Sequence, residues 1–339
     1  MPQNMDLHIP FPSRISPDFE RACAEQLVWV RAMELIRSDE AAERQLQGDY
    51  AELGARLYTS AVGADLDLGV DQCNWFFLFD DLFDGPRGED PVEAEELINA
   101  TAGALDRCPP DAAPIVRAMA DIWSRSREGM SPAWQERAER HWRLYLGGHI
   151  TEAEHRRRGI MCTSEEHMVV RRATVGVQPV LDLVERTGHF EVPARVFGSP
   201  VMAEMRQIVE DVVILQNEIV SVEKEMARGE QNNLLVIVQH ERDYTLPQSI
   251  EHVRRQAHDL VQKFLTIDGR LFELLQPLEL SAQEHRSVDR YRVEALRTTM
   301  RGCYDWHARS GRYTASYIRP PDVLGYLEDV GMPPVGRQG

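Results

Sequence analysis

The segment ADLDLGVDQCNWFFLFDDLFD, residues 64–84, is the stretch of the sequence that most strongly indicates how the chain folds. Its apolar residues recur every three or four positions, the spacing that places side chains on one face of an α-helix. The stripe consists of Leu66, Val70, Cys73 and Phe77. Gly85 and Pro86 follow directly and are typical of a helix end. The segment therefore predicts a helix over 64–84 with one apolar face.

The end of this predicted helix carries three carboxylates, Asp80, Asp81 and Asp84. Asp80 and Asp84 are four residues apart and share a helix face. The negative pole of the helix dipole lies at this end, so each carboxylate there costs a few tenths to ~1 kcal/mol. A divalent cation such as Mg²⁺ reverses this penalty because it prefers carboxylate and phosphate oxygens as ligands. The alternative is a solvated acidic helix end, but the aromatic residues directly before Asp80 favour metal binding.

A second strip of polar side chains lies in NEIVSVEKE, residues 217–225. Asn217, Ser221 and Glu225 are four residues apart, so on a helix they drift by only ~40° per step. They offer an amide oxygen, a hydroxyl and a carboxylate, an all-oxygen set that suits Mg²⁺. Lys224, one of two lysines in the chain, is adjacent and within reach of a phosphate. The alternative is the polar outer face of an amphipathic helix.

A third candidate is the pair Arg312-Tyr313, at the end of the segment WHARSGRY, residues 306–313. Both side chains can donate hydrogen bonds to a phosphate, and the guanidinium also carries charge. Taken alone, the pair is more typical of an ordinary exposed surface. Its value as a binding-site signal depends on the other two motifs.

A helix that begins near Thr163 is expected to break in its middle. Thr163 and Glu166 form a capping-box pattern at its start. Pro179 has no N–H to donate to the carbonyl four residues earlier, which belongs to Val175, and Gly176 loosens the same turn. We therefore expect a break that directs the Val175 carbonyl oxygen into a cavity. A simple proline kink is the alternative.

Helical spacing continues along most of the chain. Ser16-Pro17 and Ser199-Pro200 are typical helix starts, and the second is followed by an apolar stripe of Val201, Met205, Ile208, Val212 and Leu215. Strand-like alternation is scarce, and neither a repeat nor a low-complexity linker divides the chain. We predict an all-α fold with a single domain over residues 1–339. The Pro-rich leader, residues 1–16, and the tail after about residue 318 are expected to be flexible or to cap the site.

The composition excludes several classes of protein. The chain has 38 Lys and Arg against 55 Asp and Glu, a net charge of −17, and no basic stripe, so we expect no nucleic-acid partner. Its five scattered cysteines support neither a disulfide framework nor a zinc site. No signal-peptide pattern occurs, and no apolar run reaches the ~20 residues that span a bilayer. A cytoplasmic protein without a membrane span, monomeric or homodimeric, is expected.

Together the three motifs resemble those of the class I terpene cyclases, in particular the bacterial sesquiterpene cyclases. The family's DDxxD motif matches Asp80, Asp81 and Asp84, its N-D-(L/I/V)-x-S-x-x-K-E motif matches residues 217–225, and its terminal R-Y pair matches Arg312-Tyr313. Glu218 stands where the family usually has Asp, at a position that is not a metal ligand. The resemblance covers nearly the whole chain and implies the single-domain class I terpenoid synthase fold, with roughly a dozen helices around a deep apolar cavity.

The resemblance also implies a site for three Mg²⁺ ions and the diphosphate of a prenyl substrate. The implied metal ligands are Asp80, Asp84, Asn217, Ser221 and Glu225. The implied diphosphate-binding residues are Arg171, Lys224, Arg312 and Tyr313. Arg171 corresponds to the family's diphosphate-sensing arginine, and Thr174 and Val175 correspond to the linker and effector positions that follow it.

The activity implied by the resemblance is ionisation of farnesyl diphosphate and cyclisation of the carbocation, through a humulyl-type cation, to a polycyclic C15 hydrocarbon or alcohol. Phe76, Phe77 and Trp306 are the candidates for cation–π stabilisation, worth ~2 kcal/mol each when desolvated, with core packing as the alternative. The released diphosphate is the expected proton acceptor, ahead of His307.

Two other functions remain open from the sequence. A chain-elongating prenyltransferase would carry a second DDxxD motif where this chain has Asn217, Ser221 and Glu225. A non-catalytic helical protein that binds metal ions or a partner through its acidic clusters would leave Arg171, Lys224 and Arg312 without a common ligand.

Overall fold

The structure is a computed structural model that describes residues 5–83, 90–227, 229–315 and 317. Within these ranges the chain folds into helices joined by short loops and contains no β-strand, which confirms the all-α prediction. None of the helices described in these ranges is both long enough and apolar enough to cross a membrane.

The first half of the chain contains α1 (Phe19–Ala32), α2 (Asp39–Gly48), α3 (Tyr50–Leu57), α4 (Ala64–Phe83), α5 (Pro91–Gly103), α6 (Pro114–Ser126), α7 (Pro132–Arg158) and α8 (Ser164–Thr174). The second half contains α9 (Val177–Thr187), α10 (Ala194–Phe197), α11 (Pro200–Ala227), α12 (Leu234–Arg242), α13 (Leu246–Gly269), α14 (Leu271–Leu274), α15 (Ala282–Arg290) and α16 (Thr298–His307). A π-helical turn, η3 (Tyr291–Arg297), joins α15 to α16, and two short 3₁₀ turns, η2 (Gln276–Leu278) and η4 (Gly311–Tyr313), complete the described elements.

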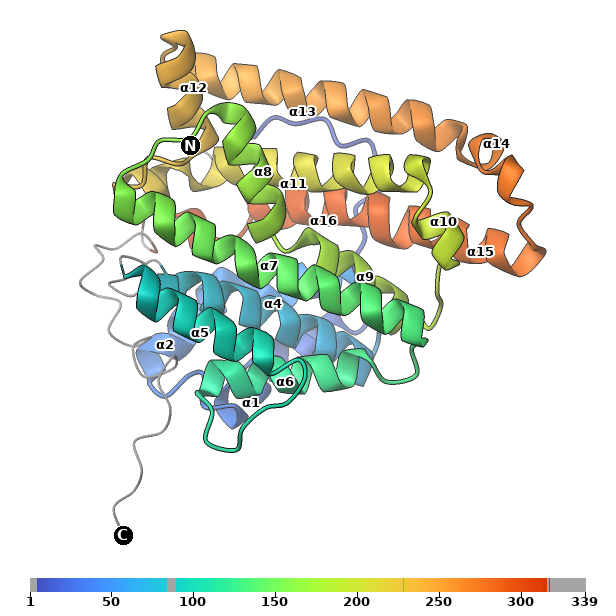
Figure 1. Cartoon of the computed structure of the whole chain (residues 1–339), viewed down its shortest axis with the longest axis horizontal. Helices are drawn as coiled ribbons and strands as arrows, with labels where there is room; N and C mark the ends of the chain where they lie inside the picture. The colour runs from blue at the N-terminus through green and yellow to red at the C-terminus, as the bar shows by residue number, and fades with distance from the viewer. Residues whose placement is uncertain (1–4, 84–89, 228, 316, 318–339) are drawn as a thin grey trace.

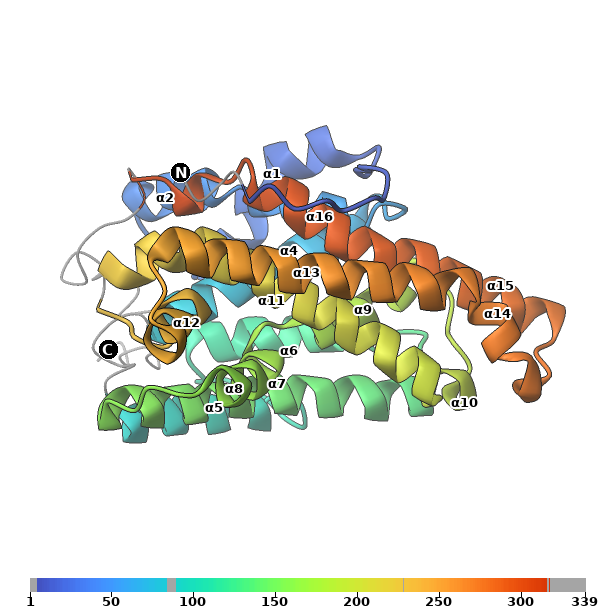
Figure 2. The same ribbon diagram turned by 90° about the horizontal axis from the view of Figure 1, so that it is seen from above.

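The long helices run lengthwise through the molecule (Figures 1 and 2). Helix α4 packs against α1, α3 and α6, while α11 packs against α8, α9, α13 and α16. Helix α7 lies along α5 and α8. Buried apolar side chains from these helices form one continuous core, against which the half-buried Met168 of α8 packs; this core holds the ends of α4, α7 and α11 in fixed positions around the site described below.

The predicted helix over residues 64–84 is observed as α4, and the helix start at Ser199-Pro200 is observed at the start of α11. Leu66, Val70 and Cys73 on the α4 stripe are buried in the core, as the periodicity predicts.

The helix start predicted at Ser16-Pro17 is wrong by two residues, because α1 begins at Phe19. The side chain of Ser16 serves a tertiary contact as well as the local turn. Its buried hydroxyl donates to the Ala61 carbonyl at 2.7 Å and accepts a hydrogen bond from the Asp18 backbone N–H at 3.1 Å.

The described part of the Pro-rich leader, residues 5–16, differs from the flexible or site-capping segment expected from the sequence. Alternate residues of this segment are buried in the core, namely Met5, Leu7, Ile9 and Phe11. Arg254 of α13 donates to the Met5 carbonyl at 2.6 Å, and Arg301 of α16 donates to the Ile9 carbonyl at 3.2 Å. Residues 5–11 therefore pack onto the core through alternate side chains, whereas residues 12–15 are exposed.

Candidate functional site

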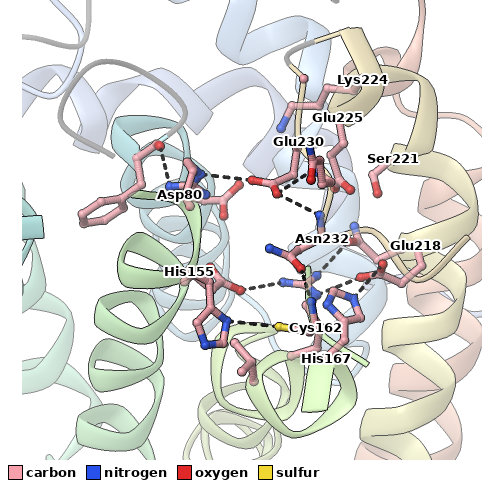
Figure 3. Close-up of a pocket in the computed structure, with 18 of the residues that line it drawn as sticks. Asp80, His155, Cys162, His167, Glu218, Ser221, Lys224, Glu225, Glu230 and Asn232 are labelled. Carbon is pink, nitrogen blue, oxygen red and sulfur yellow. Dashed lines mark hydrogen bonds and ion pairs between the residues drawn. The ribbon is translucent and has the colours of Figure 1, made fainter. Parts of the chain in front are cut away.

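The ends of α4, α7 and α11 enclose a pocket with a volume of about 550 Å³ (Figure 3). Charged side chains dominate its wall, and among the described residues the acidic and basic groups balance in number. Five are carboxylates, from Asp80, Glu152, Glu218, Glu225 and Glu230, and five are basic, from Arg156, Arg157, Arg171, Lys224 and Arg312. Phe77, Phe83, Ile160 and Val170 add apolar surface. Such a lining suits a ligand that carries both strong negative charge and an apolar part.

The two aspartates at the end of α4 differ sharply in environment. The Asp81 side chain is only 4 % exposed, and its two oxygens accept hydrogen bonds from the Arg312 guanidinium at 2.7 and 2.9 Å. Lys224 Nζ lies 3.7 Å from the same carboxylate. The Asp80 side chain is 45 % exposed and contacts Arg312 Nη2 at 3.1 Å. Asp80 is therefore the aspartate of the two that can turn to a ligand, while Asp81 anchors Arg312.

Asp84, the third aspartate of the motif, lies outside the described residues. Asp81 was not assigned as a metal ligand from the sequence. Both of its oxygens accept hydrogen bonds from Arg312, so it holds this arginine in place. Burial opposes the charge on Arg312, but Asp81 outweighs this effect and raises the pKa of Arg312 well above its ordinary value.

Across the pocket, α11 presents the predicted strip of Asn217, Ser221 and Glu225, all of which line the wall. The Ser221 hydroxyl is buried and has no hydrogen-bond partner among the described residues. Burial, together with the nearby charge of Glu218, raises the pKa of Glu225 to about 7. A cation would relieve both features, because it would coordinate the hydroxyl and stabilise the ionised carboxylate.

The donor set on α11 therefore fits a hard divalent cation. In the part of the chain that the structure describes, no three His, Cys, Asp or Glu side chains form a ready metal cluster. Of the four described donors only Asp80 and Glu225 are carboxylates, and they lie on different helices, α4 and α11. A ligand with its own oxygens would be needed to complete the coordination of an ion between them.

Arg171 projects from α8 into the same pocket and is held by several oxygens. Its Nε donates to Glu218 Oε1 at 2.8 Å and its Nη2 donates to Asn217 Oδ1 at 2.9 Å. Asn217 in turn donates to the Tyr313 hydroxyl at 3.2 Å. Burial opposes the charge on Arg171, but Glu218 and Glu152 raise its pKa above the ordinary value. These contacts bring together sequence motifs that the chain separates widely.

The predicted break after Arg171 is present. Helix α8 begins with the expected capping box of Thr163 and Glu166 and ends at Thr174, and α9 begins at Val177. Gly176 adopts the left-handed region, with φ at +73°, between the two helices. The Thr174 hydroxyl donates to Glu152 Oε1 at 2.6 Å and accepts from Arg171 Nη1 at 3.1 Å. Thr174, at the linker position, is thus hydrogen-bonded directly to Arg171. That the Val175 carbonyl points into the cavity stays a prediction.

The three predicted cation-stabilising aromatics occupy different positions. Phe77 lines the pocket, stacks on Tyr50 with ring centroids 4.4 Å apart, and lies 4.7 Å below the Arg312 guanidinium. Phe76 stacks on Trp142 at 5.2 Å and is half-buried. Trp306 is buried beside Phe77, at 5.2 Å, and its indole N–H donates to backbone carbonyls of residues 48 and 49.

Sequence reasoning missed the contribution of the α7 end to the pocket. Arg156 Nε donates to Glu230 at 3.0 Å, and its Nη1 donates to the Phe83 carbonyl at 3.3 Å. It therefore joins the ends of α4 and α7 to the loop that follows α11. The basic run HRRR, residues 155–158, was the available signal, but on a helix end it equally suits favourable interaction with the helix dipole.

A second missed feature is the pairing of two loops at the pocket rim. Asn232 Oδ1 accepts from the Cys162 backbone N–H at 3.0 Å, and its Nδ2 donates to the Ile160 carbonyl at 2.9 Å. Cys162 Sγ lies 3.1 Å from His155 Nδ1 (Figure 3). No local pattern predicts such contacts, because the two loops are about 70 residues apart in the chain.

Comparison with known proteins places these features in a family. The family model described as "Terpene synthase family 2, C-terminal metal binding" matches residues 71–263, which include the C-terminal part of α4, the α8–α9 break and α11. The pentalenene synthase of Streptomyces exfoliatus is 50 % identical over 333 residues, which cover 98 % of this chain and 99 % of that protein. The (-)-beta-caryophyllene synthase of Saccharothrix espanaensis is 37 % identical and covers 98 % of both chains.

Solved structures agree with the sequence relatives. The linalool/nerolidol synthase of Streptomyces clavuligerus superimposes with a TM-score of 0.82 at 36 % identity, over 89 % of this chain and 99 % of that one. The germacradien-4-ol synthase of Streptomyces citricolor gives the same TM-score at 26 % identity, over 91 % and 99 % of the two chains. The fold, the metal-binding family model and the full-length relatives confirm the resemblance seen in the three motifs: the chain belongs to the terpene synthases, and it is a lyase with the class I terpenoid synthase fold.

Proposed function

We propose that this terpene synthase is a Mg²⁺-dependent sesquiterpene cyclase that ionises farnesyl diphosphate and cyclises the resulting carbocation. The proposed course runs through a humulyl-type cation to a polycyclic C15 hydrocarbon or alcohol, such as pentalenene or a caryophyllene-derived product. Support comes from the relatives named above, one a pentalenene synthase and one a caryophyllene synthase whose name specifies cyclisation of farnesyl diphosphate.

The observation that carries the proposal is the opposition of two oxygen-donor groups across one pocket. Asp80 lies at the end of α4, and Asn217, Ser221 and Glu225 lie on α11, with Arg171, Lys224 and Arg312 in the same wall. A diphosphate satisfies both sets at once, because its oxygens bind the cationic side chains and complete the coordination of metal ions.

The residues that would hold three Mg²⁺ ions are Asp80 and Asp84 of the first motif and Asn217, Ser221 and Glu225 of the second. When bound, Mg²⁺ supplies positive charge that stabilises the diphosphate as it leaves. The remaining tasks fall to the side chains of this chain: they orient the diphosphate, exclude water and stabilise the carbocation.

Arg312 is positioned to exchange one partner for the diphosphate. Its Nη2 contacts both the exposed Asp80 carboxylate and the buried Asp81 carboxylate. If Asp80 bound a metal ion instead of Arg312, one N–H of Nη2 would be available to the diphosphate, while Asp81 would keep the guanidinium in place. Tyr313 and Lys224 add a hydroxyl and an ammonium group to the same wall.

Arg171, which lines the same pocket, would also bind the diphosphate, and its movement would affect the helix break. Its Nη1 is bonded to the Thr174 hydroxyl, and Thr174 immediately precedes Val175 and Gly176. A shift of the guanidinium toward the diphosphate is thereby transmitted to the turn whose Val175 carbonyl is proposed to assist ionisation.

The positions of the aromatic side chains and of His307 indicate which groups stabilise the carbocation and which group accepts the proton. Phe77 lines the pocket with Trp306 beside it, whereas Phe76 packs against Trp142; the proposed stabilisation of a carbocation by aromatic faces therefore falls first to Phe77. Burial lowers the pKa of His307 to about 3, which makes this imidazole a weak proton acceptor. The released diphosphate is therefore the proposed base.

The decisive experiment is incubation of the purified protein with farnesyl diphosphate, with and without Mg²⁺, followed by assay of diphosphate and gas chromatography of volatile products. Cyclic C15 products that require Mg²⁺ would support the proposal. Longer prenyl diphosphates formed on addition of isopentenyl diphosphate would instead indicate chain elongation.

Matched variants on α11 test the proposed ligands. Asn217→Ala and Glu225→Gln should lower kcat/KM by at least ~10²-fold, because each removes a donor to the ion that stabilises the leaving group. Glu223→Gln, an exposed position on the same helix, should leave turnover unchanged. Normal turnover by the first two variants would show that the metal assignment is wrong.

A further inference from the structure

Tyr317, four residues after the Arg312-Tyr313 pair, is buried and contacts the proposed diphosphate-binding arginine. Its hydroxyl accepts a hydrogen bond from Arg312 Nη1 at 3.1 Å. The same hydroxyl lies 3.3 Å from the hydroxyl of Tyr50, which also accepts from Arg312 Nη1 at 3.1 Å. The Tyr317 side chain is only 1 % exposed. A buried tyrosine hydroxyl is thus part of the immediate surroundings of Arg312.

The partners of Arg312 divide between its two terminal nitrogens. Nη1 contacts the hydroxyls of Tyr50 and Tyr317 and one oxygen of Asp81, all of them buried. Nη2 contacts the other oxygen of Asp81 and the exposed Asp80. The side of the guanidinium that carries Nη1 is therefore held inside the protein, and the side that carries Nη2 is directed to the pocket.

Tyr317 is itself held from the side of α2. The guanidinium of Arg44 lies over the Tyr317 ring at 3.9 Å from its centroid, and Arg44 Nη1 donates to the Tyr317 carbonyl at 3.1 Å. A stacked cation restricts the ring, while the backbone hydrogen bond fixes the chain at that residue. The ring is clamped between a cation on α2 and the arginine of the site.

We propose that Tyr317 is a positioning residue for Arg312. Arg44 holds the ring and the backbone of Tyr317 in place, and the Tyr317 hydroxyl then holds Nη1 of Arg312 so that Nη2 faces the diphosphate. This inference rests on the proposed function, in which Arg312 binds the diphosphate, and it adds residues that the three sequence motifs do not include. Tyr317 acts through Arg312 and does not touch the substrate.

The test compares Tyr317→Phe with wild type. The substitution removes only the hydroxyl and keeps the ring that stacks on Arg44. Binding of inorganic pyrophosphate with Mg²⁺, measured by calorimetry, should weaken by about 5- to 10-fold, the scale of one ordinary intramolecular hydrogen bond. The value of kcat/KM for farnesyl diphosphate should fall by a similar factor, while the variant should still unfold cooperatively and with only a small decrease in its thermal midpoint.

Tyr291→Phe is the matched control. Tyr291 is fully buried, and its hydroxyl has no hydrogen-bond partner among the described residues, so the same chemical change occurs away from Arg312. Its pyrophosphate affinity should equal that of wild type. An equal loss in the two variants would overturn the proposal, because the effect would then belong to any buried hydroxyl.

A double-mutant cycle with Arg312→Lys shows whether Tyr317→Phe weakens pyrophosphate binding through the Arg312 guanidinium. If Tyr317 acts by orienting the guanidinium, Tyr317→Phe should have little further effect once lysine replaces the arginine. An undiminished effect in the lysine background would contradict the proposal. If Tyr317→Phe does not fold, Arg44→Met replaces it and should weaken pyrophosphate binding in the same direction; normal binding by Arg44→Met would then overturn the inference.

The same data separate this inference from the proposed function. A wild-type protein that binds no Mg²⁺-pyrophosphate and forms no product contradicts both. A wild-type protein that binds and turns over normally, beside a Tyr317→Phe variant that does the same, contradicts only the positioning role.

Discussion

Glu218 Oε1 accepts a hydrogen bond from Arg171 Nε at 2.8 Å, which joins the second sequence motif on α11 to the arginine on α8. The other oxygen of the same carboxylate lies 3.0 Å from His167 Nε2 and accepts from the Leu234 backbone N–H at 2.6 Å. Although burial opposes ionisation, His167 and Arg171 lower the pKa of Glu218 to about 2. A single ionised carboxylate therefore fixes three helices, α8, α11 and α12, around the pocket.

Glu218→Gln should disturb both stability and catalysis. Loss of the charge leaves the largely buried Arg171 side chain without its closest anion, so we expect the free energy of unfolding to fall by about 3 kcal/mol. We expect kcat/KM to fall by at least ~10-fold because the guanidinium loses its orientation. Urea unfolding and steady-state kinetics measure the two effects. Glu223→Gln, exposed on the same helix, serves as the control, and a Glu218→Gln protein that matched it would disprove the anchoring role.

Gly176→Ala should strain the helix break and displace Phe76. The backbone of Gly176 has φ at +73°, and a Cβ there would lie 3.3 Å from the Phe76 ring and 3.4 Å from the Tyr145 ring. The left-handed conformation alone costs a non-glycine residue about 1–2 kcal/mol. We therefore expect lower stability, slower turnover and an altered ratio of C15 products, measured by gas chromatography.

Gly147→Ala is the control for this substitution, because a Cβ at that position would meet no atom within 4 Å beyond the backbone of its own helix. Gly147 lies within α7, where alanine should stabilise the helix by about 0.5–1 kcal/mol. An unchanged product ratio in Gly176→Ala would show that the position of Phe76 does not influence the course of cyclisation.

Pro179→Ala tests the proposed role of the Val175 carbonyl. Pro179 lies in the first turn of α9, and an alanine there would supply an N–H able to bond the Val175 carbonyl four residues earlier. We expect ionisation to slow by several-fold, because a bonded carbonyl oxygen is less able to polarise the substrate. Single-turnover release of diphosphate measures the step. A rate equal to that of wild type would remove the carbonyl from the mechanism.

Glu210 makes stability depend on pH. It lines a second hollow, of about 430 Å³, between α7, α8, α9 and α11, and one of its buried oxygens has no hydrogen-bond partner among the described residues. Burial raises the pKa of Glu210 to about 7 from an ordinary 4.5. Between these two values the folded protein binds more protons than the unfolded chain, so stability falls as pH rises through this window.

Glu210→Gln should therefore be more stable than wild type at pH 8, by about 2 kcal/mol, and nearly equal to it at pH 4.5. Urea unfolding at the two pH values measures the difference. The exposed Glu204→Gln on the same helix should show no such pH-dependent gain. A gain of equal size at both pH values would show that burial of the ionised carboxylate is not the cause.

The sequence alone determined the features whose causes are local. The apolar stripe from Leu66 to Phe77 predicted α4, the capping box at Thr163 predicted the start of α8, and Gly176 with Pro179 predicted the break. Each depends on interactions between residues at most a few positions apart, so the pattern of residue types is sufficient. The spacing of Asn217, Ser221 and Glu225 likewise placed three donors on one helix face, whatever surrounds that helix.

Which of these groups contact one another, and what each one does, depends on the tertiary structure. Asp80 and Asp81 are neighbours in sequence, yet α4 turns one toward the pocket and buries the other against Arg312, 231 residues later. Glu218, a small departure from the family motif, became the anchor of Arg171, and Tyr317 reached Arg312 from outside all three motifs. Such pairings depend on how the long helices pack, and packing combines many weak contacts between distant residues that no short segment records.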